Sequence, residues 1–319
     1  VCRVSSTTVC LPSKAGFRLM WEIYLLQGLA GGLVTGSIYA LIALSLVIIY
    51  KSTQVINFAG GEIVMIASYV ALFVLLYTGM SYWIVVPLCA ISTFIIGISF
   101  ERVVLTRIQG RQAPGQSVLV AMVIATVGLS YILKGIIRPI PYADEVRTLP
   151  PMMAIDPVFI GPAVISRQDI AIFGIAVFSM IALFVFFQFT PLGRALRATA
   201  DNARAAALVG IPVARMRALV WGLACGLSAI AGILIAPKVL MTPDMGGLII
   251  LAFAAAIIGG FTNFPGVIVG GFALGIIENI VGLTISSNAI SVTPFIVIIL
   301  VLLVRPQGLF GGPSEVKKV

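Results

Sequence analysis

The chain has 319 residues, of which 60% are hydrophobic and only 10% are charged. A soluble domain usually carries about 25% charged residues, so this composition excludes a soluble globular protein and indicates one that is solvated by lipid. The net charge of +9 does not indicate nucleic-acid binding, because the basic residues fall in short segments between apolar stretches, as membrane orientation requires.

The N-terminal segment differs in composition from the rest of the chain. Residues 1–19 lack the apolar core of a signal peptide or of a membrane span, whereas Met20 opens the segment that leads into the first apolar stretch. We therefore predict that 1–19 is a non-native or disordered tail. Residues 20–312 are predicted to form a single transmembrane domain, and 313–319 a cytoplasmic tail.

Long stretches without any charged residue follow one another along the chain. They are 28–50, 63–100, 112–133, 170–193, 218–237, 245–277 and 279–304. A span needs about 20 apolar residues, and in lipid its backbone must satisfy its own hydrogen bonds, so the stretches are predicted to be helices. The two longest are interrupted at 78–81 and 262–266. We predict an all-α, polytopic membrane helix bundle of about eight to nine transmembrane segments with broken or re-entrant helices.

Loop charge predicts the orientation of these segments. Basic residues concentrate in 102–111, in 190–217 and at the C-terminus, and such loops lie on the cytoplasmic side. The proline-rich segment 138–168 has mixed charge and is predicted to face the other side. An outside N-terminus and a cytoplasmic C-terminus require an odd number of crossings. This is met only if 248–260 and 265–283 are separate arms that run in opposite directions.

Glycines repeat at intervals of four within several predicted helices. The repeats are Gly28, Gly32 and Gly36, then Gly222 and Gly226, Gly266 and Gly270, and Gly271 and Gly275. Because glycine lets two helix backbones approach closely and gain dispersion contacts, we predict that these faces pack within the bundle and not between subunits.

The segment 190–212 is too polar to span a membrane, and it is predicted to contain an amphipathic helix over 191–209. Thr190 can cap this helix and Pro191 suits its first turn. Alanines, the best helix formers, dominate its middle, and Gly210 ends it.

At about 100° per residue, four charged side chains of this helix fall on one stripe. We predict that the helix docks onto a cytoplasmic partner, and the residues expected to couple it to that partner are Gly193, Arg194, Arg197, Asp201 and Arg204. The alternatives are a solvated connecting loop and a helix that lies on an anionic lipid surface.

Polar side chains within apolar stretches are costly in lipid, so they mark candidate residues of a substrate pathway. They are Asn57, Glu62, Asn263, Glu278 and Asn279. The segments 57–60 and 263–266 both read Asn-Phe-x-Gly and each interrupts a long apolar stretch. Paired interruptions point to broken helices around a central pathway. The alternative for Glu62 and Glu278 is a position at the membrane interface near a loop.

Nothing in the sequence indicates catalysis, a cofactor or a metal site. The chain has no histidine, which is the commonest general base and metal ligand. No lysine follows a glycine, so the phosphate-binding motif Gly-x-x-x-x-Gly-Lys is absent from the sequence. We predict a protein that is not an enzyme, and any ATP must then be hydrolysed by another chain.

Four segments together resemble one family of membrane permeases. The first is 36–50 followed by V-I-N-F-A-G-G-E at 55–62. The second is A-F-A-A-A-I-I-G-G-F-T-N-F-P-G-V-I-V-G-G at 252–271. The third is T-P-L-G-R-A-L-R-A-T-A-D-N-A-R, which begins at Thr190, and the fourth is 302–311. They are similar to the two signatures, the coupling-helix loop and the C-terminal end of the branched-chain amino acid permease family of ABC importers, called LivH/LivM. The similarity extends over nearly all of 22–312 and is greater to the LivH type.

The resemblance implies a membrane-spanning subunit of an ABC-type importer in the bacterial inner membrane. Its substrate would be branched-chain or related amino acids, with urea, amides or aromatic acids as alternatives within the family. The implied partners are two cytoplasmic ATP-binding subunits, a second permease subunit, a periplasmic or extracellular substrate-binding protein, and membrane lipid.

The alternative from another class is a secondary transporter or channel that works alone. Secondary carriers usually couple transport through carboxylates or histidines within the membrane, and this chain has no histidine and few such acids. A membrane enzyme is disfavoured, because no nucleophile, base and metal-ligand set is clustered in the sequence.

Overall fold

The structure is a computed structural model, which describes residues 14–110, 117–140, 148–153, 156–160, 163–261 and 263–311. Its helices are α1 (Lys14–Thr53), α2 (Gly60–Thr78), α3 (Tyr82–Phe100), α4 (Thr106–Gly110), α5 (Val118–Ile137), α6 (Arg167–Phe189), α7 (Pro191–Asp201), α8 (Ala203–Leu208), α9 (Val213–Ile235), α10 (Leu248–Gly259), α11 (Phe264–Thr284) and α12 (Thr293–Val304). A π-helical turn at Glu101–Leu105 joins α3 to α4, and 3-10 turns lie at Met245–Gly247 and Ser287–Ser291.

Seven helical segments of the described chain are long and apolar enough to cross a membrane, and two shorter apolar helices, Met245–Gly259 and Thr293–Val304, accompany them. Together they match the predicted eight to nine segments. Helix α1 begins at Lys14, within the segment 1–19 that was predicted to be a tail. Residues 1–13 lie outside the described part of the chain.

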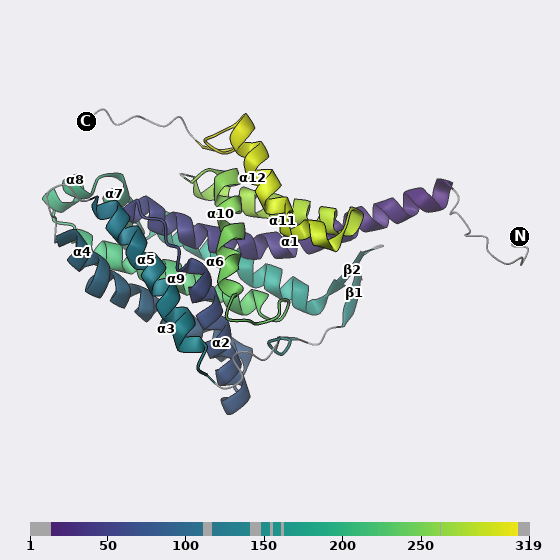
Figure 1. Cartoon of the computed structure of the whole chain (residues 1–319), viewed down its shortest axis with the longest axis horizontal. Coiled ribbons are helices and arrows are strands. Elements are labelled where there is room, and N and C mark those ends of the chain that lie inside the picture. The colour runs from purple at the N-terminus through teal and green to yellow at the C-terminus, as the bar shows by residue number, and fades with distance from the viewer. Residues whose placement is uncertain are drawn as a thin grey trace, which may run out of the picture.

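The predicted loop at 138–168 contains the two strands of the described chain, which the sequence analysis did not anticipate. Strands β1 (Pro157–Ile160) and β2 (Ala163–Ser166) form an antiparallel hairpin. Gln27 of α1 holds this hairpin, since its amide donates to the Val164 carbonyl at 2.8 Å and accepts from the Val164 N–H at 3.0 Å. The hairpin and the start of α1 lie at one end of the molecule, hereafter the hairpin end, while α7 and α8 lie at the opposite end (Figure 1).

Helices α1 and α9 form the centre of the bundle. In their most apolar windows 89% and 83% of the residues are buried, against 22% in α5, in α6 and in the segment Tyr82–Gly110. The central helices are therefore surrounded by protein. The peripheral helices present apolar faces outward, as segments in contact with lipid or with a partner subunit do.

The repeated glycines mark close helix contacts within the chain, as predicted. Gly32 and Gly36 of α1 lie against the backbone of Ile276 and Phe272 in α11, so that a side chain at either glycine would strike the neighbouring backbone. The later glycine in one helix faces the earlier residue in the other, and α1 and α11 are therefore antiparallel.

Helices α10 and α11 are separate arms joined by a sharp turn, which confirms the predicted break. Gly260 has φ 88°, a left-handed conformation that favours glycine. Gly259 packs against Gly266, and Ala255 against Gly270, so the two helices run in opposite directions. The backbone N–H of Leu309 donates to the Ile258 carbonyl at 2.8 Å, and the C-terminal segment thereby covers the turn.

Candidate functional site

The segment predicted to be one helix over 191–209 is two helices, α7 and α8, with a break at Asn202. Asn202 has an extended backbone that ends α7, and its side-chain oxygen accepts from the Ala205 N–H at 3.0 Å, which caps α8. The predicted start is confirmed, because Thr190 Oγ1 accepts from the Gly193 N–H at 2.9 Å. The break follows from the preference of asparagine for N-cap positions.

The predicted docking side chains do not form a single stripe. Arg194, Arg197, Asp201 and Arg204 are all exposed, but Arg204 belongs to α8, across the break from the other three. Arg197 Nη1 donates to Gln188 Oε1 of α6 at 2.9 Å, so this side chain turns back toward the bundle. Arg194 and Arg204 are also exposed, and neither side chain makes such a contact within the described chain.

The opposite face of α7 packs onto the transmembrane helices. Leu196 is 2% exposed, and a cavity of about 320 Å³ separates α7 from the end of α1 and the start of α11. Lys51 and Asp201 line this cavity from opposite sides, and the ammonium of Lys51 lies 4.6 Å from the centroid of the Phe264 ring. Helix α7 itself packs against α6, α9 and α1, so a displacement of α7 would move these helices directly.

The two interruptions predicted from the Asn-Phe-x-Gly segments, 57–60 and 263–266, are connected through α10. Phe58, between α1 and α2, stacks on Phe253 of α10 with ring centroids 5.9 Å apart. Phe253 contacts Phe261 in the α10–α11 turn at 6.0 Å, and Phe261 contacts Tyr50 at 5.2 Å. We call these four residues the aromatic row. It joins the two breaks in the helices across the bundle.

Three charged side chains meet where α2 begins, and we call them the polar cluster. Glu62 Oε1 lies 3.6 Å from Lys134 Nζ of α5, and the same Nζ lies 3.6 Å from Asp244 Oδ1, just before the 3-10 turn Met245–Gly247. The Glu62 side chain is 6% exposed, and its Oε2 has no hydrogen-bond partner among the described residues. Charged groups inside a membrane bundle are costly and mark functional positions. This applies to the buried Glu62 most strongly, since the Asp244 side chain is 74% exposed.

Lys134 and Asp244 were not among the predicted pathway residues. Lys134 directly follows the charge-free stretch 112–133 and lies inside α5, so a charge within an apolar helix was the available signal. Asp244 gave no such signal. It reaches the cluster because the chain after α9 returns to the bundle and places Gly246 against the Glu62 side chain.

The other predicted pathway residues have separate surroundings. Asn57 Oδ1 accepts from the Ala59 N–H at 3.1 Å, and Asn279 Nδ2 donates to the Gly275 carbonyl at 2.9 Å. Glu278 Oε1 accepts from the Tyr39 hydroxyl at 3.3 Å, while its Oε2, like that of Glu62, has no partner among the described residues. No described contact links Glu278 or Asn263 to the polar cluster. Within the described chain no group of three or more His, Cys, Asp or Glu side chains could hold a metal ion.

Comparison with known proteins decides the class of this bundle. The profile of the family described as "Branched-chain amino acid transport system / permease component" matches residues 28–304. The chain belongs to this family. The permease is therefore a multi-pass membrane protein and not an enzyme, as the sequence predicted.

Individual relatives extend over almost the whole permease. It is 32% identical over 312 residues to the high-affinity branched-chain amino acid transport system permease protein LivH of Salmonella typhimurium, which covers 93% of this chain and 98% of the relative. It is 34% identical over 310 residues to the corresponding permease protein BraD of Pseudomonas aeruginosa, covering 94% and 100%. The predicted resemblance to LivH is thus confirmed.

One solved structure has a similar fold. PsaBC from Streptococcus pneumoniae in complex with Fab superposes with a TM-score of 0.50 at 13% identity, covering 89% of the permease and 92% of that chain. At this identity the likeness shows the fold alone, and it supports the predicted polytopic helix bundle.

Proposed function

We propose that the permease is the membrane-spanning subunit of an ABC-type importer that carries branched-chain or related amino acids across the bacterial inner membrane. The observation that carries this proposal is the capped, exposed helix pair α7–α8, which is too polar for the membrane and packs against α1, α6 and α9. In this proposal the pair faces the cytoplasm and contacts an ATP-binding subunit. The hairpin end then faces outward, where a substrate-binding protein delivers its ligand to this subunit and a second permease subunit.

The polar cluster and the aromatic row fit the chemistry of an amino acid in transit. Lys134 can attract a carboxylate, while Glu62 and Asp244 can attract an ammonium, so the cluster offers both charges that a zwitterion needs. The rings of the aromatic row offer an apolar surface to a branched side chain. Urea, amides and aromatic acids remain alternative substrates because their polar groups can bind the same side chains.

The five predicted pathway residues contribute differently to this proposal. Glu62 and Glu278 each have an oxygen left without a partner within the described chain, so both retain a place on the pathway. Asn57 and Asn279 bind neighbouring backbone groups and support the helices that line it. Asn263 precedes α11 at the α10–α11 turn.

Transport should depend on partner subunits. The purified permease alone in liposomes is expected to hydrolyse no ATP and to accumulate no leucine, because its sequence has no phosphate-binding loop. Addition of two ATP-binding subunits, a second permease subunit and the binding protein should give ATP-dependent uptake of radiolabelled leucine. Accumulation by the permease alone under a proton or sodium gradient would instead support the secondary-transporter alternative.

Charge reversal on the helix pair should weaken assembly. A buried charge pair across an interface costs about 2–5 kcal/mol when one partner is removed, which is roughly 30-fold or more in affinity. Arg194→Glu and Arg204→Glu are therefore expected to reduce co-purification of the ATP-binding subunits and ATPase activity stimulated by the binding protein. The variant Arg197→Glu would, in addition, lose the hydrogen bond that Arg197 donates to Gln188 of α6.

The matched control for these variants is Arg138→Glu, an exposed arginine at the C-terminal end of α5, a helix that does not pack against α7 or α8. It should leave association with the ATP-binding subunits unchanged. If Arg194→Glu and Arg204→Glu associate as fully as this control, α7–α8 is a helix pair on the membrane surface and not the coupling contact.

A further inference from the structure

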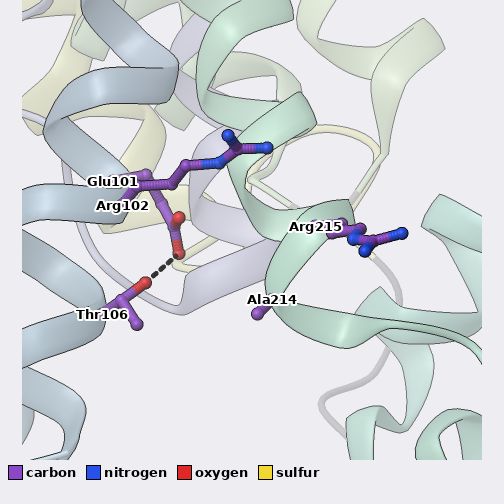
Figure 2. Close-up of a pocket in the computed structure, with 5 residues that line it drawn as sticks. All are labelled: Glu101, Arg102, Thr106, Ala214 and Arg215. Atoms are coloured by element: carbon purple, nitrogen blue, oxygen red, sulfur yellow. Dashed lines mark hydrogen bonds between the residues drawn. The ribbon is translucent and has the colours of Figure 1, made fainter.

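A cavity of about 500 Å³ lies apart from the polar cluster, where the end of α3 meets the start of α9. It is lined by Glu101, Arg102, Thr106, Ala214 and Arg215 (Figure 2). The transport proposal uses none of these residues. The backbone between Glu101 and Leu105 is a π-helical turn, a distortion that occurs frequently at functional sites.

Glu101 provides a buried carboxylate that the chain satisfies only in part. The residue is 1% exposed. Its Oε1 accepts from the Thr106 hydroxyl at 3.2 Å and lies 3.6 Å from Arg217 Nε, and Figure 2 shows the bond to Thr106 as a dashed line. Its Oε2 has no hydrogen-bond partner among the described residues. A buried charged oxygen without a partner is costly. Because Glu101 lines the cavity, a rotation of its carboxylate would let this buried oxygen accept from a donor that enters the cavity.

The mouth of the cavity carries the opposite charge. Arg102 and Arg215 are both exposed, and Figure 2 shows that they come from different helices that border the cavity. Guanidinium groups are well suited to bind the oxygens of a phosphate. The cavity therefore suits a ligand with an anionic group near its mouth and a cationic donor in its interior.

The position of the cavity along the bundle corresponds to the lipid headgroups. Glu101 lies nineteen residues after Tyr82, the start of α3, which is about 28 Å at about 1.5 Å per residue. Arg217 lies eighteen residues before Ile235, the end of α9, or about 27 Å by the same rise. Both lengths are close to the thickness of the hydrocarbon layer, about 30 Å, so the cavity lies at the membrane surface near α7–α8.

An apolar stripe leads from the membrane interior to the mouth of the cavity. It consists of the exposed α3 residues Ile84, Leu88, Ile91 and Ile95, which recur at helical spacing on the side of α3 that continues to Arg102. Acyl chains could lie along this stripe while their headgroup enters the cavity. This continuity favours a membrane lipid over a soluble partner.

We propose that the cavity binds the headgroup of a phosphatidylethanolamine molecule. Its phosphate lies between Arg102 and Arg215, and its ammonium donates to Glu101 Oε2. Phosphatidylglycerol has no ammonium to pair with this oxygen, and the quaternary ammonium of phosphatidylcholine has no N–H to donate. The lipid would connect the end of α3 to the start of α9 beside the α7–α8 helix pair.

The test is native mass spectrometry of the delipidated permease in detergent, titrated with dioleoyl phosphatidylethanolamine, phosphatidylcholine or phosphatidylglycerol. A hydrogen bond to a charged group is worth about 1.5–3 kcal/mol, so the wild type should retain phosphatidylethanolamine about tenfold or more tightly than the other two. Arg102→Gln with Arg215→Gln should weaken binding of all three lipids. Glu101→Gln should abolish only the preference for phosphatidylethanolamine.

Two controls make these results specific. Arg107→Gln removes an exposed charge from α4, outside the cavity, and should bind as the wild type does. Thermal unfolding of Glu101→Gln should show that the bundle is intact, because glutamine can still accept from Thr106.

Several outcomes would overturn the proposal. Equal affinity of the wild type for the ethanolamine and choline lipids, or a preference that survives in Glu101→Gln, would remove the role of Glu101. Tighter binding of phosphatidylglycerol would indicate a simple basic surface. Equal competition by soluble phosphoethanolamine would indicate a soluble ligand. Loss of ATP-binding subunits from the Arg102→Gln, Arg215→Gln variant without lipid selectivity would indicate a protein contact.

Discussion

Replacement of Lys134 by methionine is expected to stop transport and to lower the free energy of unfolding by about 2–3 kcal/mol. Breaking a fully buried ion pair costs about 3–5 kcal/mol, because the remaining charge stays buried without a partner. The Lys134 side chain is 27% exposed and that of Glu62 is 6% exposed, so a smaller loss is expected here. The measurements are leucine uptake by the reconstituted complex and the midpoint of thermal unfolding.

A second substitution separates stability from transport. Glu62→Gln removes the buried negative charge while preserving the shape of the side chain, so the double variant Glu62→Gln, Lys134→Met should recover most of the lost stability. Its transport should remain absent if the polar cluster contacts the substrate. Normal uptake by this double variant would show that the cluster only holds α2 and α5 together.

The matched control is Lys238→Met, which breaks an ion pair outside the cluster. Lys238 Nζ lies 2.5 Å from Asp169 Oδ1, with 30% of the lysine side chain exposed. This variant should lose stability by a similar or smaller amount, yet it should retain transport once the complex is assembled.

Gly275→Val is expected to prevent folding of the bundle. A side chain at this position would strike the backbone of Gly36 and the carbonyl of Gly32 in α1, and backbone atoms cannot rotate away as a side chain can. Relief requires separation of α1 from α11, which loses the close contacts that hold membrane helices together. Expression yield and the monodisperse fraction in size-exclusion chromatography should both fall to a small part of the wild-type values.

Gly128→Val in α5 controls for the helix propensity of valine. Nothing lies within 4 Å of the position that its Cβ would occupy, so this variant should retain yield close to that of the wild type. If Gly275→Val and Gly128→Val give equal yields, the close approach of α1 and α11 is not needed for folding.

The sequence was sufficient to predict features that depend on local composition. The apolar stretches without charge predicted the membrane spans, because a backbone in lipid must satisfy its own hydrogen bonds, as a helix does. The four-residue spacing of Gly28, Gly32 and Gly36 predicted a packed helix face. Which helix packs there was not predictable, since the contact with α11 joins segments about 240 residues apart along the chain.

Other features depended on competition between local preferences or on distant contacts. Asn202 is a strong N-cap residue, but the surrounding alanines favoured one continuous helix, and only the structure decides between them. The hairpin of β1 and β2 depends on Gln27, which binds Val164 from far along the chain. Asp244 joined the polar cluster because of the path of the chain after α9, which composition does not reveal.

The uninterrupted length of α1 has a mechanical consequence. Gln27 is bound to the hairpin, and Lys51, twenty-four residues later, lines the cavity beside α7, so about 36 Å of one rigid helix separates them. If this segment of α1 tilts by about 5° about its midpoint, its two ends move in opposite directions by about 1.5 Å each. Binding on one face of the membrane can therefore be sensed on the other by rotation of a single rod, without a relay of rearranged side chains.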